Sequence, residues 1–79
     1  MKTRVHVFLK PGVLDVQGKA IEGALHTLGF SGAANVRVGK TIEFDLPGQD
    51  AAAAEAQATR MAEELLANTV IEGYRIEVG

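Results

Sequence analysis

Few residues in this sequence are of a type that carries chemistry, and they are scattered. His6 and His26 are the only histidines, serine occurs once as Ser31, and cysteine is absent. Neither histidine has an acidic or thiol neighbour at metal-ligand spacing, and Ser31 lacks the flanking pattern of a nucleophile turn. A general base also needs a positioned nucleophile or an orienting group. We therefore expect no catalytic residue and no metal site on this chain.

Carboxylates and glycines are more numerous, but they lack the spacing of a functional motif. Asp15 and Glu22 show no paired geometry with each other, and the same holds for Glu63 and Glu64. The glycines punctuate turns and caps, whereas a phosphate-binding loop would place a lysine and a hydroxyl directly after them. No cofactor-binding residue is predicted.

Two small basic groups lie beside glycines. Lys10 precedes Pro11-Gly12, and Arg37 precedes Gly39-Lys40. Either group could bind an anion locally, but solvated lysines at turn ends are the more common meaning of such a pattern.

Length and composition narrow the class of protein. The chain has 79 residues and a net charge of -2, which predicts one domain over residues 1–79 with a thin core, since a chain this short buries only about 60% of its unfolded surface. Self-association is therefore expected. The charge and the lack of a Lys/Arg cluster argue against a nucleic-acid partner. The absence of cysteine, of an export signal and of an apolar run near ~20 residues predicts a cytoplasmic protein without a membrane partner.

Hydrophobic periodicity predicts six elements. Strands with alternating apolar residues are expected around residues 5–9, 36–38, 42–46 and 74–78, with Gly39-Lys40 as a type II′ hairpin turn between the middle two. Helices are expected after Asp15 and Asp50, the two N-caps, and the first should end at Gly29. Their predicted buried stripes are Ala20, Ile21, Ala24, Leu25 and Leu28 in the first, and Ala54, Ala58, Met61, Ala62, Leu65 and Leu66 in the second.

The order β-α-β-β-α-β predicts an α+β fold of the split βαβ, ferredoxin-like type. In this arrangement both helices cover one face of a four-stranded antiparallel sheet. The other face would be open to solvent or to a partner. It would carry Arg4, His6, Phe8, Arg37, Glu43, Asp45, Arg75 and Glu77.

Three stretches taken together resemble the PurS family, the small subunit of phosphoribosylformylglycinamidine (FGAM) synthase. They are Lys10 to Gly18, Val36 to Lys40, and Leu65 to Tyr74, with Leu28-Gly29-Phe30 also in place. The resemblance covers essentially the whole chain. The family usually has proline at the position of Val16, and proline and aspartate at those of Thr69 and Gly73, which affects turn stiffness and not chemistry.

The resemblance implies a subunit of a ligase complex that makes FGAM from formylglycinamide ribonucleotide, ATP and glutamine in purine biosynthesis. In that family the PurQ glutaminase releases ammonia and the PurL synthetase uses ATP and magnesium. The small subunit would carry neither active site. It would bridge PurQ and PurL as a homodimer or homotetramer and aid passage of ammonia.

Exposure and turn chemistry single out candidate partner-binding residues, which are Lys10, Gly12, Asp15, Gln17, Gly18, Arg37, Gly39, Lys40, Asn68 and Glu72. A purely structural role in a rigid turn is an equal alternative for the glycines. The leading alternative function is a dimeric small-molecule-sensing domain, since such a fold does not fix function. A single-stranded RNA module would need more stacking aromatics than Phe8 on the open face, and an enzyme acting alone has no candidate site.

Overall fold

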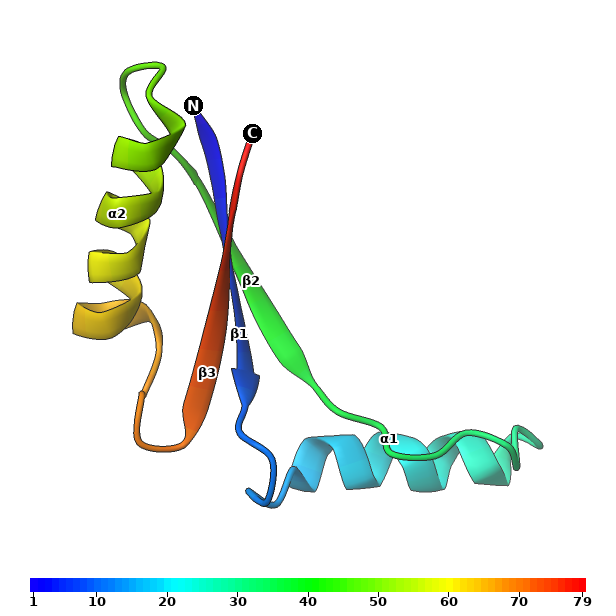
Figure 1. Cartoon of the computed structure of the whole chain (residues 1–79). Coiled ribbons are helices and arrows are strands. Elements are labelled where there is room, and N and C mark those ends of the chain that lie inside the picture. The colour runs from blue at the N-terminus through cyan, green and yellow to red at the C-terminus, as the bar shows by residue number, and fades with distance from the viewer.

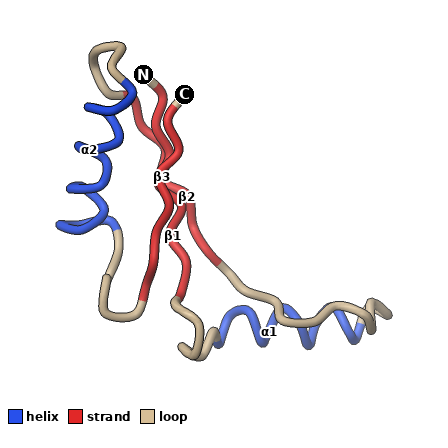
Figure 2. Tube along the Cα trace, viewed as in Figure 1, coloured by secondary structure: helices blue, strands red, loops and turns tan.

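The computed structural model describes residues 1–79 and contains two α-helices, a π-helical turn and three strands (Figures 1 and 2). In chain order they are β1 (Lys2–Leu9), α1 (Val16–Thr27), β2 (Gly39–Asp45), α2 (Ala51–Met61), η1 (Ala62–Leu66) and β3 (Glu72–Val78). The architecture is therefore α+β, as predicted. None of the helices has the length and apolar character that crossing a membrane would require.

The sheet has three strands in the order β2-β1-β3, and both pairings are antiparallel. Val5 in the central strand lies opposite Ile42 on one side and Ile76 on the other. The prediction of four strands is wrong, because residues 36–38 form no strand. Gly39 and Lys40 open β2 and do not form a hairpin turn.

The missing strand has a local physical cause. The amide N–H of Val36 donates to the Glu22 carboxylate at 3.1 Å, and that of Val38 donates to the Asp15 carboxylate at 2.7 Å. Side chains from α1 and its cap thus satisfy donors that a strand would have given to a neighbour. The residues alternate in hydropathy like a strand, but their hydrogen bonds go elsewhere.

Helix α2 covers one face of the sheet. Ala58 and Ala62 are fully buried, and they pack with Val5, Val7 and Ala67 in the main core cluster. Alanine at the contact positions allows a helix to lie close to a sheet. Asp50 caps this helix as predicted, its carboxylate accepting from the amides of Ala52 and Ala53.

The second predicted stripe is confirmed except at Leu65, since Ala62 is buried and Leu66 packs against the core near its end. Ala54 and Ala58 are buried, whereas Leu65 is 82% exposed. The last turn, η1, is a π-helix, whose wider turn alters the 3.6-residue period on which the prediction relied. Leu65 consequently points outward.

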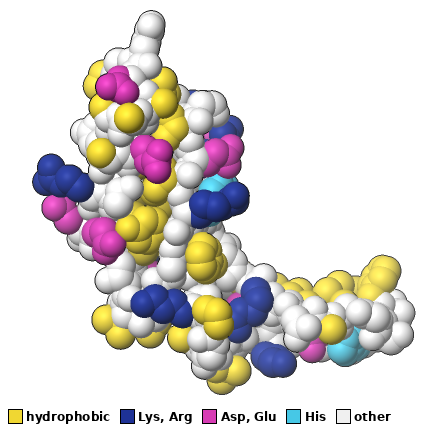
Figure 3. Space-filling model, viewed as in Figure 1, with side chains coloured by type: hydrophobic (Ala, Val, Ile, Leu, Met, Phe, Trp, Pro, Cys, Tyr) yellow, Lys and Arg dark blue, Asp and Glu magenta, His cyan; other side chains and the backbone are white.

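Helix α1 projects away from the sheet as an arm (Figure 1). Its expected position beside α2 on the same face is wrong, and its apolar stripe is not buried within this chain, since Ile21 is 39% and Leu28 72% exposed. The radius of gyration is 15.8 Å, against about 12 Å for a compact chain of this length. In Figure 3 hydrophobic side chains run along the arm to its tip.

The ends of α1 agree with the sequence. Asp15 is the N-cap and its side chain accepts from the amide of Gly18. At the other end Gly29 has φ of 100°, and the amides of Gly29 and Phe30 donate to the carbonyls of His26 and Leu25. This is the Schellman pattern that a glycine in this place predicts.

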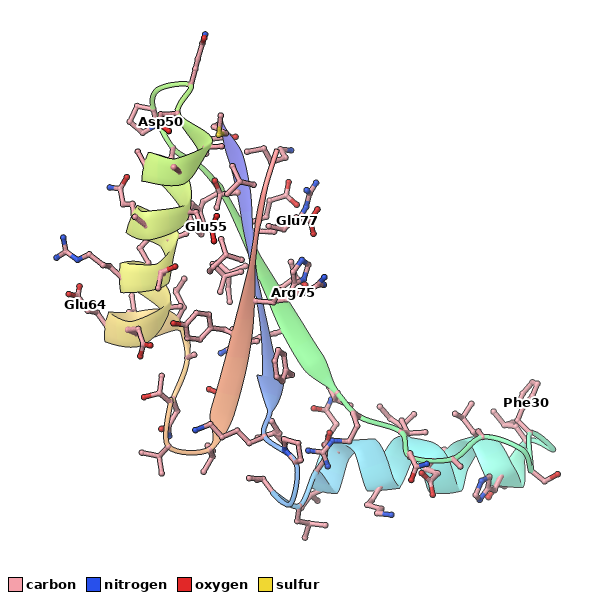
Figure 4. All side chains as sticks on the ribbon, viewed as in Figure 1. Phe30, Asp50, Glu55, Glu64, Arg75 and Glu77 are labelled. Carbon is pink, nitrogen blue, oxygen red and sulfur yellow. The ribbon has the colours of Figure 1, made fainter.

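The second face of the sheet is polar and its charges pair with one another. Arg4 contacts Glu43 and Glu77 at 3.3 and 3.2 Å, and His6 hydrogen-bonds Glu77 at 2.8 Å. Figure 4 shows Glu77 and Arg75 on the side of the sheet away from α2. The prediction of an open polar face is confirmed there, but not for Arg37, which lies outside the strands.

Candidate partner-binding site

Three segments meet at the base of the arm, and we call this region the junction: residues 10–18, 36–40 and 67–72. The first and third lie side by side, since the Lys10 amide donates to the carbonyl of Ile71 at 2.9 Å. The Lys10 ammonium donates to the carbonyl of Thr69 at 2.7 Å. Every candidate partner-binding residue predicted from the sequence lies in the junction.

Asp15 joins the first two segments. The residue is 4% exposed, and the two oxygens of its carboxylate bind different parts of the chain. Oδ1 accepts from the Gly18 amide at 2.7 Å, and Oδ2 accepts from the Val38 amide at 2.7 Å. The carboxylate is thus an internal connector, not a surface group.

Arg37 joins the same two segments from the other side, because it lies in the second segment and binds the backbone of the first. Its guanidinium donates to the carbonyl oxygens of Val13 at 3.1 Å, Lys10 at 3.3 Å and Leu9 at 3.5 Å. Its Nε lies 4.0 Å from Oδ2 of Asp15. The planar fork of arginine suits such multiple acceptors, which a lysine could not match.

Two junction glycines are required by close approach. A Cβ on Gly18 would overlap the carbonyl oxygen of Val36 and lie 2.9 Å from Cγ of Asp15. A Cβ on Gly39 would lie 2.7 Å from the carbonyl oxygen of Val7. Gly12 differs, because it has open space but a φ of 89°, which favours glycine.

The third segment is a tight turn organised by two polar residues. The Asn68 amide donates to the Glu72 carboxylate at 2.6 Å, and the Asn68 side-chain oxygen accepts from the Val70 amide at 3.2 Å. The Glu72 amide donates back to the Asn68 carbonyl at 2.7 Å. Val70 is left 82% exposed at the tip.

Two open hollows are lined mainly by junction residues, and a third, about 460 Å³, is lined by Phe8, Leu9, Pro11 and Arg37. The first, about 320 Å³, is lined by Gly12, Val13, Leu14, Asp15, Lys19, Asn35, Val36 and Arg37. The second, about 270 Å³, is lined by Val7, Phe8, Leu9, Asp15, Gln17, Val38, Gly39, Lys40 and Glu72. Leu14 is 69% exposed at the rim of the first. The surface therefore combines hollows, apolar side chains and the charged Lys40.

The electrostatics of the junction are those of carboxylates bound by backbone amides. Hydrogen bonds from the amides of Val38 and Gly18 lower the pKa of Asp15. A hydrogen bond from the Val36 amide lowers the pKa of Glu22 in the same way. Both groups are therefore held in their charged form. Nowhere in the chain do three or more His, Asp or Glu side chains cluster as metal ligands.

The sequence patterns single out the three segments but not their meeting, and they miss two residues that matter there. The sequence patterns assign Glu22 no function, yet its carboxylate accepts a hydrogen bond from the Val36 amide. Phe8 lies against Gly73, where a Cβ would come within 2.8 Å of its ring. From the sequence, the departure from the family at Gly73 is expected to affect turn stiffness only, and nothing in the helical pattern indicates the role of Glu22.

The fold and the junction define a class of protein, a small α+β chain whose polar residues hold its own segments in place while apolar residues such as Leu14 and Val70 stay exposed. The model of the PurS family, described as phosphoribosylformylglycinamidine (FGAM) synthase, matches residues 2–79. The chain belongs to this family.

Relatives agree along nearly the whole chain. The FGAM synthase subunit PurS of Synechocystis is 47% identical over 95% of this chain and 75% of its own length. That of Bacillus subtilis is 44% identical over 98% of this chain and 90% of its own length.

Solved structures share the fold. A crystal structure of B. subtilis PurS has a TM-score of 0.85 at 42% identity, covering 99% of this chain and 96% of its own. A chain in the structure of PurLQS from Thermotoga maritima has a TM-score of 0.87 at 28% identity, covering 96% of this chain and 93% of its own. A fold like that of this chain therefore occurs in a chain of a multi-subunit complex.

Proposed function

We propose that this chain is the non-catalytic small subunit of the FGAM synthase complex and that it bridges the PurQ glutaminase and the PurL synthetase. The observation that carries the proposal is the match along the whole chain to PurS, including a chain from PurLQS of T. maritima. The complex works in the cytoplasm and uses ATP and magnesium, while this chain binds no cofactor of its own.

In this role the chain contributes contacts and no reaction step. PurQ releases ammonia from glutamine, and PurL uses ATP to convert formylglycinamide ribonucleotide into the amidine. Ammonia that escapes into water is diluted and protonated. A subunit that holds the two active sites together raises the effective concentration of ammonia at PurL.

The junction is the proposed contact surface for the large subunits. It offers exposed apolar side chains at Leu14 and Val70, and Lys40 is exposed beside the second hollow. Aromatic or aliphatic anchors surrounded by polar groups are typical of protein interfaces. The junction residues with buried side chains, such as Asp15, act there by shaping the surface.

The arm is the proposed contact between copies of the chain. Its apolar stripe, with Ile21 and Leu28, is exposed, and β2 is the strand that α2 covers least, which leaves Ile42 and Phe44 only half-buried. Packing of one chain's arm on this part of a second sheet would complete both surfaces. Such a contact is reciprocal, as in a twofold homodimer.

Leu28→Gln tests the arm contact. Burying a leucine contributes roughly 1.5–3 kcal/mol, so the association constant should fall at least about tenfold, measured by sedimentation equilibrium. Thr27→Gln, one position along the same helix, is the control and should leave association unchanged. An unaltered association constant for Leu28→Gln would remove the arm from the interface.

Reconstitution tests the bridging role. PurL and PurQ are assayed for amidine formation with and without this chain, using glutamine in one series and ammonia in the other. The chain should be required with glutamine and matter little with ammonia. Equal glutamine-driven rates without the chain would refute the proposal, and binding of a metabolite by the isolated chain would favour the sensing domain.

A charge reversal tests the junction as the contact surface. Lys40→Glu should weaken assembly with the large subunits without changing thermal stability. Arg60→Glu introduces the same charge change on α2, where the Arg60 side chain is 78% exposed and lies outside the junction, and it should assemble normally. Equal assembly of the two variants would exclude Lys40 from the contact.

A further inference from the structure

The direction of the arm relative to the sheet is set at its base. Helix α1 makes no extensive contact with any strand or with α2. It is joined to the sheet by two chain crossings, residues 10–15 before it and residues 36–38 after it, as Figures 1 and 4 show. The first crossing includes Gly12 at a φ of 89°. Two such loops alone would leave the arm free to swing.

The carboxylate of Asp15 ties the two crossings together. One oxygen binds the first turn of α1 through the Gly18 amide, and the other binds the second crossing through the Val38 amide, each at 2.7 Å. The residue is 4% exposed. Hydrogen bonds to a charged acceptor with little access to water are among the stronger ones.

Arg37 ties the crossings in the reverse sense. It belongs to the second crossing and donates to Val13 and Lys10 of the first, at 3.1 and 3.3 Å. The two residues thus form a reciprocal pair, each reaching from its own crossing to the backbone of the other. A single bond would permit rotation about itself, whereas several non-collinear bonds do not.

We propose that Asp15 and Arg37 form a latch that fixes the angle between α1 and the sheet, and that they are positioning residues for assembly. The assembly part rests on the proposed function, while the angle does not. An arm held in its binding orientation loses less conformational entropy on association than a swinging one. Partner subunits therefore meet a preformed surface.

Asp15→Asn distinguishes the role of Asp15 in the latch from its role as the helix N-cap. Asparagine is as good an N-cap as aspartate, but it has one acceptor oxygen and must give up one of the two bonds. Asp50→Asn is the matched control, because Asp50 is also an N-cap accepting two amides, and both bonds use one oxygen and stay within α2. Arg37→Met is the second variant, since the Arg37 side chain is 44% exposed and outside the core.

The measurement is the distance distribution between spin labels on Thr27→Cys in the arm and Glu55→Cys on α2. The chain has no cysteine of its own, so labelling is specific, and dilution with unlabelled chain isolates intrachain pairs. The parent and Asp50→Asn should give one narrow distribution. Asp15→Asn and Arg37→Met should roughly double its width, with the circular dichroism of the helices retained.

Assembly is measured on the same variants. Asp15→Asn and Arg37→Met should weaken assembly with the large subunits at least about tenfold, whereas Asp50→Asn should not. Unchanged distance distributions in both latch variants would overturn the proposal. Broadened distributions with normal assembly would overturn the positioning role. If the parent itself fails to support the glutamine reaction, the proposed function fails, and the distances still judge the latch.

Discussion

At the level of single residues, the packing around Gly18 decides whether the first turn of α1 can accommodate a side chain at this position. Gly18 and Gly23 lie in the same helix, but a Cβ on Gly18 would meet the backbone of Val36, whereas a Cβ on Gly23 would have nothing within 4 Å. The two glycines therefore form a matched pair for separating helix propensity from local space.

Gly18→Ala should destabilise the protein, because the second crossing must move to admit the methyl group. Gly23→Ala should stabilise it by about 0.5–1 kcal/mol, the usual gain in a helix interior. Urea unfolding of both variants checks the prediction. A stabilising Gly18→Ala would mean that Val36 is not held against the helix.

Acid should loosen the junction through Asp15. Its pKa is lowered in the folded state, by the Val38 amide first and the Gly18 amide second, from an ordinary value of 3.8. Since the folded pKa lies below the unfolded one, the stabilisation is complete above 3.8 and is lost as the pH falls through the folded pKa.

The parent should therefore lose more stability than Asp15→Asn on acidification from about pH 5 to pH 3. Urea unfolding at a series of pH values gives both curves, and their difference isolates this group from Glu22, Glu43 and Glu77, whose pKa values are lowered too. Parallel curves would contradict the assignment.

At the level of elements, the contact between α2 and the sheet depends on small side chains. Ala58 is 0% exposed against the core, while Ala56 on the same helix is exposed. Ala58→Leu should cost about 1–3 kcal/mol by overpacking, and Ala56→Leu should stay within about 0.5 kcal/mol. Denaturant midpoints measure both, and similar effects would mean that α2 has room to shift.

Sequence patterns predicted the elements better than their arrangement. Alternation at Val5 and Val7 and the caps at Asp15 and Asp50 arise from local chemistry, so they could be read directly. An apolar stripe such as that with Leu28 shows only that a helix face needs cover, not which chain supplies it. The prediction of a fourth strand is wrong because the amides of Val36 and Val38 donate hydrogen bonds to carboxylates 14 and 23 residues away along the chain.

The junction was partly predictable for the same reason. Glycines next to charged residues marked the turns that meet there, and the family resemblance identified their order. The direction of Arg37, toward carbonyl oxygens of the first crossing, depends on the angle of the arm. That angle is a tertiary property, and no local pattern contains it.

At the level of the whole molecule, the chain is extended for its size, with dimensions of 48 × 25 × 14 Å. The main core cluster contains five buried residues, and the arm adds nothing to it. The proposed packing of the arm on a second copy of the chain predicts that folding and association are linked.

The thermal midpoint should therefore rise with protein concentration. Calorimetry at two concentrations about a hundredfold apart should show this shift in the parent, and the shift should be smaller in Leu28→Gln. A midpoint independent of concentration would mean that the isolated chain is already fully stable.

Tyr74 links β3 to η1 through a hydrogen bond from its hydroxyl to the Glu63 carboxylate at 2.8 Å, which also raises the pKa of the tyrosine. The chain has one tyrosine and no tryptophan. Its near-ultraviolet absorption and emission therefore come almost wholly from this one phenol. A carboxylate acceptor quenches phenol emission, so brightening would report separation of η1 from the sheet, and the protein carries its own optical probe of that contact.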